Sequence, residues 1–295
     1  MKPNYRLEPW MYLLPALLIY TVAVLVPVVW SLVYSFFDWD GIKPMQFAGW
    51  GNYIRMARDT KMLNAFTNNL KFMALGTLVQ VFMGLFMATL LYNINKGSNI
   101  LRVLYFIPCI ISSMAICKIF DKLLSVQPEG LVAAIVKMMG NKPMAVLSSP
   151  KYALTAVALI DAYKFCGLYM VIFYSAFMAI DHEIIEAAYI DGCTWIQQYI
   201  HVMLPMIKPI FFTVLVILVN GTLKSFDISY ILTKGGPGSA SELVATYMYK
   251  VSFGSTRLGY GSAISVFLLV ESLIAVGIIR FFGNRANRED NTTGG

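Results

Sequence analysis

Residues 186–205 read EAAYIDGCTWIQQYIHVMLP, a polar and patterned stretch that lies between two long apolar runs. The residues before Gly192 have the pattern of a short helix, and a glycine with positive φ commonly ends such a helix. Thr194 and Gln197 then have the spacing of a capping box, which marks the start of another helix. Pro205 closes the stretch. The pattern therefore predicts two short helices joined by a tight turn at Gly192.

The rest of the chain is unusually apolar. Of its 295 residues, 58% are hydrophobic and 13% are charged, whereas soluble domains are nearer half apolar and a quarter charged. A helix needs roughly 20 apolar residues to cross a bilayer. We therefore expect an all-α polytopic membrane protein, a single transmembrane domain over residues 1–295. Its six predicted membrane spans are 10–37, 70–92, 103–124, 154–180, 209–232 and 263–282.

The charge pattern bears on topology and partners. The formal net charge is +7, but the basic residues are scattered over loops, which favours contact with anionic lipid and acidic partners over nucleic acid. The first apolar run is too long for a cleaved signal segment, so we read it as a retained span. Basic residues in short loops favour a cytoplasmic location for both ends and for residues 181–208. We expect the tail, 283–295, to be flexible.

The stretch 181–208 could be an amphipathic linker lying on the membrane. Asp181 is placed to cap its first helix, with Glu183 in the first turn. Ala187 and Ala188, together with Gly192, form a surface of small residues, whereas a lipid-facing helix favours Leu, Phe and Trp. Small residues allow another backbone to approach closely, so the pattern favours docking against a protein.

These residues carry a family resemblance. Glu186-Ala187-Ala188, three residues, Gly192, nine residues and then Val202-x-Leu204-Pro205 resembles the EAA loop of membrane subunits of ATP-binding-cassette importers. Two positions depart from the family pattern, since Val202 stands where Ile is usual and His182 where Pro is usual. The opening LLPALLIYTVAVLVPVVWSLVYSFFDWDG, the segment RVLYFIP and the segment FDISYILTKGGPGSASELVATYMYKVSF are similar to the maltose-type carbohydrate permeases, so the resemblance covers most of the chain.

The resemblance implies a type I ABC importer permease fold in which residues 181–208 form a cytoplasmic coupling loop. It implies a permease subunit of an ATP-driven, binding-protein-dependent importer of sugars or oligosaccharides, which forms half of the translocation pathway. The implied partners are a second homologous permease, two ABC ATPase subunits and an extracellular solute-binding protein, in a bacterial inner or plasma membrane. The residues implied in coupling to the ATPase are Glu186, Ala187, Ala188, Asp191, Gly192, Leu204 and Pro205.

The sequence lacks the motifs of a self-sufficient enzyme. It contains no GxxxxGK[ST] loop to bind ATP phosphates, and the glycine-rich GGPGSAS has no lysine. The HEIIE at 182–186 lacks the second histidine of a zinc protease motif, and the four cysteines form no CxxC pair. We therefore expect no catalytic residue, no metal and no cofactor in this chain, and ATP hydrolysis by partner subunits.

Polar residues within the spans suggest a pathway, because a charge at mid-bilayer costs on the order of 3 kcal/mol. Sugars need carboxylate and amide partners, and aromatic faces such as those of Tyr169 and Phe226. Alternatively, Asp161 and Lys164 could pair on one helix face, or amides could bond between helices. A secondary carrier with Asp161 or Glu271 as its ion site is the alternative function. The residues that we expect along a substrate pathway are Gln80, Tyr163, Lys164, Asn220, Lys224 and Asp227.

Overall fold

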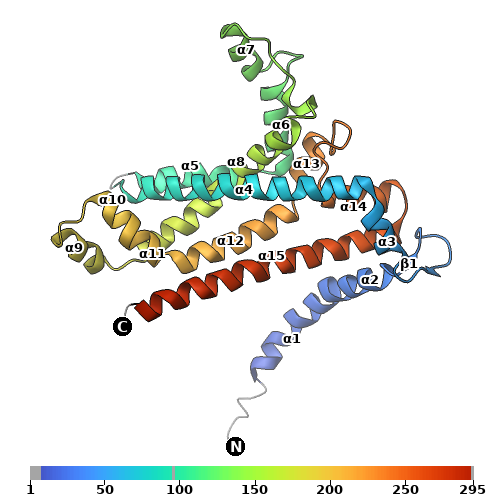
Figure 1. The fold of residues 1–295 in the computed structure, drawn as a ribbon, viewed down its shortest axis with the longest axis horizontal. Helices are drawn as coiled ribbons and strands as arrows, with labels where there is room; N and C mark the ends of the chain where they lie inside the picture. Colours follow the sequence, from blue (N-terminus) through green and yellow to red (C-terminus); the bar gives the residue numbers. More distant parts are fainter. Residues whose placement is uncertain (1–7, 95–96, 294–295) are drawn as a thin grey trace, which may run out of the picture. The chain divides into compact units, whose positions relative to one another are not determined.

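A computed structural model describes the backbone of residues 8–94 and 97–293 and the side chains of residues 12–94 and 97–286. This part of the chain is mostly helical (Figure 1). Its short strands β1 (Phe37–Asp38) and β2 (Gln46–Phe47) pair antiparallel, with Phe37 opposite Phe47. Additional π-helical turns cover Thr21–Leu25, Tyr199–Met203 and Lys250–Gly254, and a 3-10 turn covers Val146–Ser148. The helices are α1 (Glu8–Tyr20), α2 (Val26–Tyr34), α3 (Gly51–Arg58), α4 (Thr60–Tyr92), α5 (Ser98–Ile110), α6 (Ser113–Leu124), α7 (Leu131–Met138), α8 (Ala153–Met178), α9 (His182–Ile190), α10 (Trp195–Gln198), α11 (Leu204–Met206), α12 (Lys208–Leu223), α13 (Asp227–Leu232), α14 (Val244–Tyr249) and α15 (Leu258–Thr293).

Long apolar helices dominate the described residues, as the composition predicts. Five segments are long and apolar enough to cross a membrane, and the bent pair α5 and α6 makes six if it counts as one span. The five segments are Tyr12–Tyr34, Thr60–Tyr92, Ala153–Met178, Lys208–Leu232 and Leu258–Ala286.

The third expected span differs from the prediction. We expected one helix over 103–124, but the structure has α5 and α6 bent by 94°. Ile111 and Ser112 between them take extended backbone conformations, and the Ser112 side chain accepts a hydrogen bond from the amide of Ala115. The serine thus caps a new helix in a new direction. A cap inside an apolar run is easily missed, since the hydropathy hardly changes there.

Helical backbone extends into the predicted tail. We expected 283–295 to be flexible, which stays a prediction; the backbone of α15 continues to Thr293, and residues 294–295 lie outside the described part. Residues 284–293 contain neither proline nor glycine. Nothing in the sequence therefore stops a helix that is already formed from continuing, because extending a helix is much easier than starting one.

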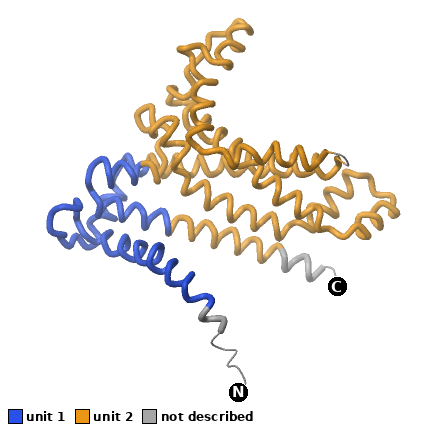
Figure 2. The backbone as a smooth tube through the Cα atoms, turned by 180° about the vertical axis from the view of Figure 1, so that it is seen from behind, with its two compact units in different colours: residues 1–63, 247–269 blue, residues 64–246, 270–295 orange. Residues whose placement is uncertain are grey.

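The chain forms two compact units, which Figure 2 colours separately. Unit 1 comprises residues 1–63 and 247–269, and unit 2 comprises residues 64–246 and 270–295. Within unit 1, the buried amide of Asn52 donates to the carbonyl oxygens of Ser35 and Phe37, each at 2.9 Å. These bonds fix the turn between α2 and α3.

Asp59 joins the two chain segments of unit 1. Its Oδ2 accepts from the hydroxyls of Tyr247 at 2.5 Å and Tyr260 at 2.8 Å, and its Oδ1 accepts from the amides of Lys61 and Met62 at the start of α4. Burial raises the pKa of Asp59, but these four donors outweigh it and hold the pKa below its usual range. Burial and the Asp59 carboxylate raise the pKa of the Tyr247 phenol. At neutral pH the cluster is therefore a carboxylate held by neutral phenols.

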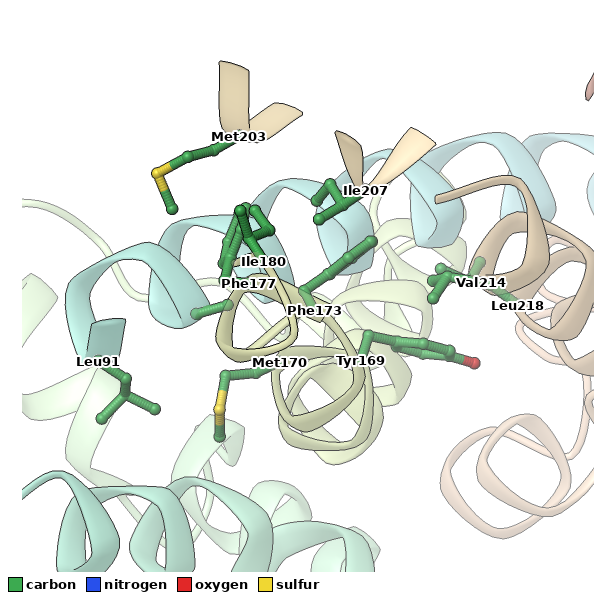
Figure 3. Packing of buried hydrophobic residues seen from close by; sticks show 11 residues of the cluster. Leu91, Tyr169, Met170, Phe173, Phe177, Ile180, Met203, Ile207, Val214 and Leu218 are labelled. Atoms are coloured by element: carbon green, nitrogen blue, oxygen red, sulfur yellow. The ribbon is translucent and has the colours of Figure 1, made fainter. Parts of the chain in front are cut away.

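The core of unit 2 lies where α4, α8 and α12 meet the segment that follows α9. Figure 3 shows Phe173 and Phe177 of α8, and Ile180 just after it, close to Met203 and Ile207, all of them buried. Close packing holds helices together in lipid, where burial from water contributes little. Gly167 illustrates this closeness, because a Cβ added there would lie 2.0 Å from the Tyr105 carbonyl oxygen of α5. Ile185, Tyr199 and Leu204, from the segment between α8 and α12, also pack against this core.

Candidate functional site

The segment 181–208, which we call the coupling segment, connects α8 to α12 and contains α9, α10 and α11. Figure 1 shows α9 and α10 at one end of the long helices of unit 2. The turn after α9 is the one that the sequence predicts. Gly192 has φ +82°, and its amide donates to Tyr189 while the amide of Cys193 donates to Ala188. These two bonds form a Schellman motif.

The start of α10 also agrees with the prediction. Thr194 and Gln197 form a capping box, in which the Thr194 amide donates to Gln197 Oε1 at 2.8 Å and the Gln197 amide donates to Thr194 Oγ1 at 3.4 Å. The expected cap at the other end is wrong, since the Asp181 side chain makes no capping hydrogen bond to α9. Asp181 has the extended backbone of an N-cap, so the backbone alone begins that helix.

Tyr199 anchors the coupling segment to the long helices. Its hydroxyl and the Thr89 hydroxyl of α4 lie 2.9 Å apart, with Thr89 donating. Its ring lies 5.9 Å from that of Phe177 and stacks on Trp195 at 5.6 Å. Tyr199 thereby connects the end of α10 to α4 and α8.

Helix α9 has an inner and an outer face. Ile185 packs against the core cluster and Ala188 is half-buried. Glu186 and Ala187 are exposed on the outer face, as is Ile190, which is 82% exposed. An exposed surface that combines a carboxylate with small and apolar side chains suits docking against a protein.

The structure places the remaining predicted coupling residues around these helices. Asp191 is the exposed C-cap of α9, beside Gly192. Leu204 packs against the core cluster, and Pro205 is exposed in the first turn of α11. Glu186, Ala187, Asp191 and Pro205 are thus accessible to a partner, whereas Leu204 holds the segment to the bundle.

Unit 2 also contains a cavity of about 340 Å³ between α4, α8, α12 and α13, which we call the polar cavity. Its lining includes the aromatic residues Phe165, Tyr169 and Phe226. The lining residues with polar side chains are Gln80, Ser113, Asp161, Tyr169, Thr222, Lys224, Ser225 and Asp227.

Asp161 is the most buried charged group of the polar cavity, with 4% of its surface exposed. Gln80 Nε2 donates to its Oδ2 at 3.1 Å, and the Ser225 hydroxyl donates to its Oδ1 at 3.3 Å. Asp161 therefore connects α4, α8 and the link between α12 and α13. Two donors leave lone pairs of the carboxylate available to a further hydroxyl or amide.

A second set of polar contacts includes Lys164. Its ammonium donates to the Ser113 hydroxyl at 2.5 Å, and that hydroxyl donates to Asp227 Oδ2 at 3.5 Å. The alternative of an Asp161–Lys164 ion pair is wrong, because neither described ion pair contains these residues. The lysine instead points to α6, which the 94° bend brings beside α13. The sequence could not show that bend.

Of the predicted pathway residues, Gln80, Lys224 and Asp227 line the polar cavity. Lys164 lies behind Ser113 and does not line it. The ring of Tyr163 packs edge-on against Phe120, and Asn220 is half-buried on α12; both lie outside the lining. The predicted residues did not include Ser113, Ser225 and Thr222, which also line the polar cavity, since short hydroxyl side chains are common in any helix. For Asp161, the sequence signal was a charged residue within an apolar span.

Comparison with known proteins identifies the family. Residues 80–288 match the family model described as "binding-protein-dependent transport system inner membrane component". The chain belongs to this family. The match includes the whole coupling segment and every lining residue of the polar cavity, so both lie in the part that defines these transport components.

Individual relatives agree with this membership. The chain is similar to the probable ABC transporter permease protein YurN of Bacillus subtilis (strain 168), with 31% identity over 284 residues, 94% of this chain and 96% of that protein. It is 26% identical to the lactose transport system permease protein LacF of Rhizobium radiobacter over 294 residues, 98% and 97% of the two chains. This membrane component thus matches its relatives over nearly their whole length.

A solved structure shows the fold. A chain of a bacterial alginate ABC transporter, crystallised with an alginate pentasaccharide-bound periplasmic protein, superposes with a TM-score of 0.85 at 19% identity. The superposition covers 97% of this chain and 98% of that one. The expected all-α type I importer permease fold is therefore confirmed. As an inner membrane component of a transport system, the chain has a transport role and not an enzymatic one.

Proposed function

We propose that this permease moves a sugar or oligosaccharide through the polar cavity and that the coupling segment transmits the action of partner ATPases to it. It forms half of a pathway that a second, similar permease completes. The names of the relatives support a carbohydrate solute, since they include a lactose permease and a trehalose/maltose permease. The observation that carries the proposal is the polar cavity inside an apolar bundle.

The polar cavity has the chemistry that a polyol needs. Gln80, Asp161 and Ser225 offer both donors and acceptors, so they can exchange hydrogen bonds with hydroxyl groups. Phe226 stacks on Tyr230 with ring centroids 5.0 Å apart, which presents a flat apolar surface for the C–H face of a sugar ring. A volume of about 340 Å³ is in the range of small-molecule sites.

The balance of charges also favours a neutral solute. The lining contains one basic residue, Lys224, and two acidic residues, Asp161 and Asp227. Outside the lining, Lys164 is connected to Asp227 through the hydroxyl of Ser113. A dedicated anion site would need an excess of basic groups, and a simple cation site would lack the lysines. Hydroxyl groups suit such a mixed lining best.

The coupling segment supports an external source of energy. The sequence has no phosphate-binding loop, so ATP must be hydrolysed by another chain. The exposed outer face of α9, with Glu186 and Ala187, offers that chain a docking surface on a helix pair that the Gly192 turn and the Thr194 cap make stiff. An extracellular binding protein would deliver the solute to the opposite side.

Uptake by the reconstituted complex tests the proposal. The permease would be purified with its partner permease and ATPases, placed in liposomes, and supplied with binding protein and a panel of labelled oligosaccharides and amino acids. We expect ATP-dependent accumulation of an oligosaccharide. Transport by the purified chain alone, driven by a proton or sodium gradient, would show a secondary carrier instead. Accumulation of an amino acid would refute the carbohydrate assignment.

A further inference from the structure

Glu271 lies in the last membrane span, on α15, and its side chain is bonded to a residue of α4 in unit 2. Asn69 of α4 is fully buried, and its Nδ2 donates to Glu271 Oε1 at 3.4 Å. The same Nδ2 donates to the carbonyl oxygen of Leu223, the last residue of α12, at 3.1 Å. Asn69 therefore connects α15 with the end of α12.

One atom of each side chain lacks a hydrogen-bond partner. Asn69 Oδ1 and Glu271 Oε2 are both buried, and neither accepts nor donates a hydrogen bond within the described residues. A buried polar atom without a partner is costly, and two such atoms on one bonded pair are unusual. If the carboxyl group is ionised, both atoms are acceptors only, so they cannot bond to each other.

Turning the amide of Asn69 does not remove the difficulty. The Leu223 carbonyl oxygen can only accept, so the NH₂ group of Asn69 must face it and Oδ1 must lie on the other side. An ionised Glu271 would also lack a cation, since no lysine, arginine or histidine nitrogen in the described part of the chain lies within 4.0 Å of its carboxylate. An isolated charge in a membrane span is unfavourable.

We propose that Glu271 is a neutral carboxylic acid that donates its proton from Oε2 to Asn69 Oδ1. The acid and the amide then form a reciprocal pair with two hydrogen bonds, Asn69 Nδ2 to Oε1 and Oε2 to Oδ1. One proton, taken from water when the helices assemble, satisfies both atoms and removes the charge.

The pair makes Glu271 a positioning residue for the polar cavity. Leu223 receives the second hydrogen of the Asn69 amide, and its neighbours Thr222 and Lys224 line the polar cavity. Glu271 orients Asn69, which in turn holds the end of α12. This role requires a neutral hydrogen-bonding group on α15 and does not depend on which solute is carried.

Three variants in the reconstituted complex separate this role from that of a charged carboxylate. In Glu271→Gln the side-chain amide can make the same two bonds, so we expect uptake within about twofold of the wild type. Glu271→Leu and Asn69→Leu leave buried groups without partners, and we expect uptake to fall by about tenfold in each. If Glu271→Gln were as defective as Glu271→Leu, the neutral pair would be refuted.

Infrared spectroscopy tests the proton directly, even if a leucine variant fails to fold. The wild-type complex at neutral pH should show the C=O stretch of a protonated carboxyl group that is absent from Glu271→Gln. In Asn69→Ala the same band should shift, because its hydrogen-bond acceptor is lost. Wild-type and Glu271→Gln spectra that are identical in this region would mean that Glu271 is ionised, and would overturn the proposal. Neither outcome bears on whether the solute is a sugar.

Discussion

The coupling segment and the polar cavity are built in opposite ways. The turn and cap of the coupling segment use bonds between residues at most five positions apart, from Ala188 to Gln197. In the polar cavity, Gln80 lies 81 positions from Asp161, and Ser225 lies 64 positions from it. The coupling segment can keep its shape while the bundle around it moves, whereas the polar cavity exists only while several helices keep their places.

This difference fits a transport component. A part that receives force from a partner has to be stiff, and local bonds supply stiffness at any position of the bundle. A site that has to open toward either face needs the opposite property, because a site fixed by one segment could not be dismantled by helix movement. Variants that affect one region and spare the other test the comparison.

The largest effect is expected at the turn of the coupling segment. In Gly192→Val the φ of +82° would be strained by about 1–2 kcal/mol, although an added Cβ would meet no atom within 4 Å. Relief of that strain would swing α10 relative to α9 and misplace the docking surface. We expect ATP-dependent uptake to fall to background while membrane insertion is unchanged, measured in cells that carry the complete transporter.

Gly140 provides a matched control. It follows α7 with φ +79° and the same pair of hydrogen bonds, from its amide to Lys137 and from the Asn141 amide to Val136. An added Cβ there also meets nothing within 4 Å. Gly140→Val should therefore carry the same strain and retain uptake. Equal loss in both variants would mean that strain alone, and not its place, stops transport.

The local bonds explain how much the sequence could predict. Gly192, Thr194 and Gln197 indicate their own turn and cap, because the residues that form each bond lie within five positions of one another in the chain. Local sequence was not sufficient at Asp181. Aspartate is a common N-cap residue, but the Asp181 side chain makes no capping hydrogen bond. Apolar length likewise predicts the spans, but not the bend at Ser112, where one hydroxyl decides between continuing and restarting a helix.

The polar cavity was predictable only in part. Gln80, Lys224 and Asp227 could be chosen because polar groups are rare in spans. Their partners could not, since the contact of Lys164 with Ser113 depends on where α6 points after its bend. Asp161 and Lys164 are three residues apart and suit an ion pair by spacing, yet each finds a hydroxyl on another element. Long-range packing decided these contacts.

A smaller effect is expected from Asp161 in the polar cavity. Asp161→Leu removes the acceptor for Gln80 and Ser225 and leaves buried donors unsatisfied, so we expect uptake to fall by about tenfold. Asp161→Asn should lose less, because the Ser225 hydroxyl can turn and accept from the new amide while Gln80 still donates. Initial uptake rates over a range of solute concentrations would measure both.

Asp121 serves as the control for Asp161, since it is an exposed aspartate on α6 outside the polar cavity. Asp121→Leu should leave the uptake rate unchanged. If Asp161→Asn were as inactive as Asp161→Leu, the negative charge of Asp161 would be what transport needs. If both variants transported normally, the polar cavity would not lie on the pathway.

The smallest effect is expected at the cap of α10. Thr194→Ala removes the side-chain acceptor for the Gln197 amide, which costs about 1 kcal/mol at a helix start. Tyr199 still holds the segment to Thr89 and Phe177, so we expect only about a twofold loss of uptake. Hydrogen exchange of the α10 amides should become faster in Thr194→Ala and stay slow in Thr194→Ser, which keeps the hydroxyl. Equal exchange in the two variants would mean that α10 is held by the bundle, and that the coupling segment owes its stiffness to long-range packing, as the polar cavity does.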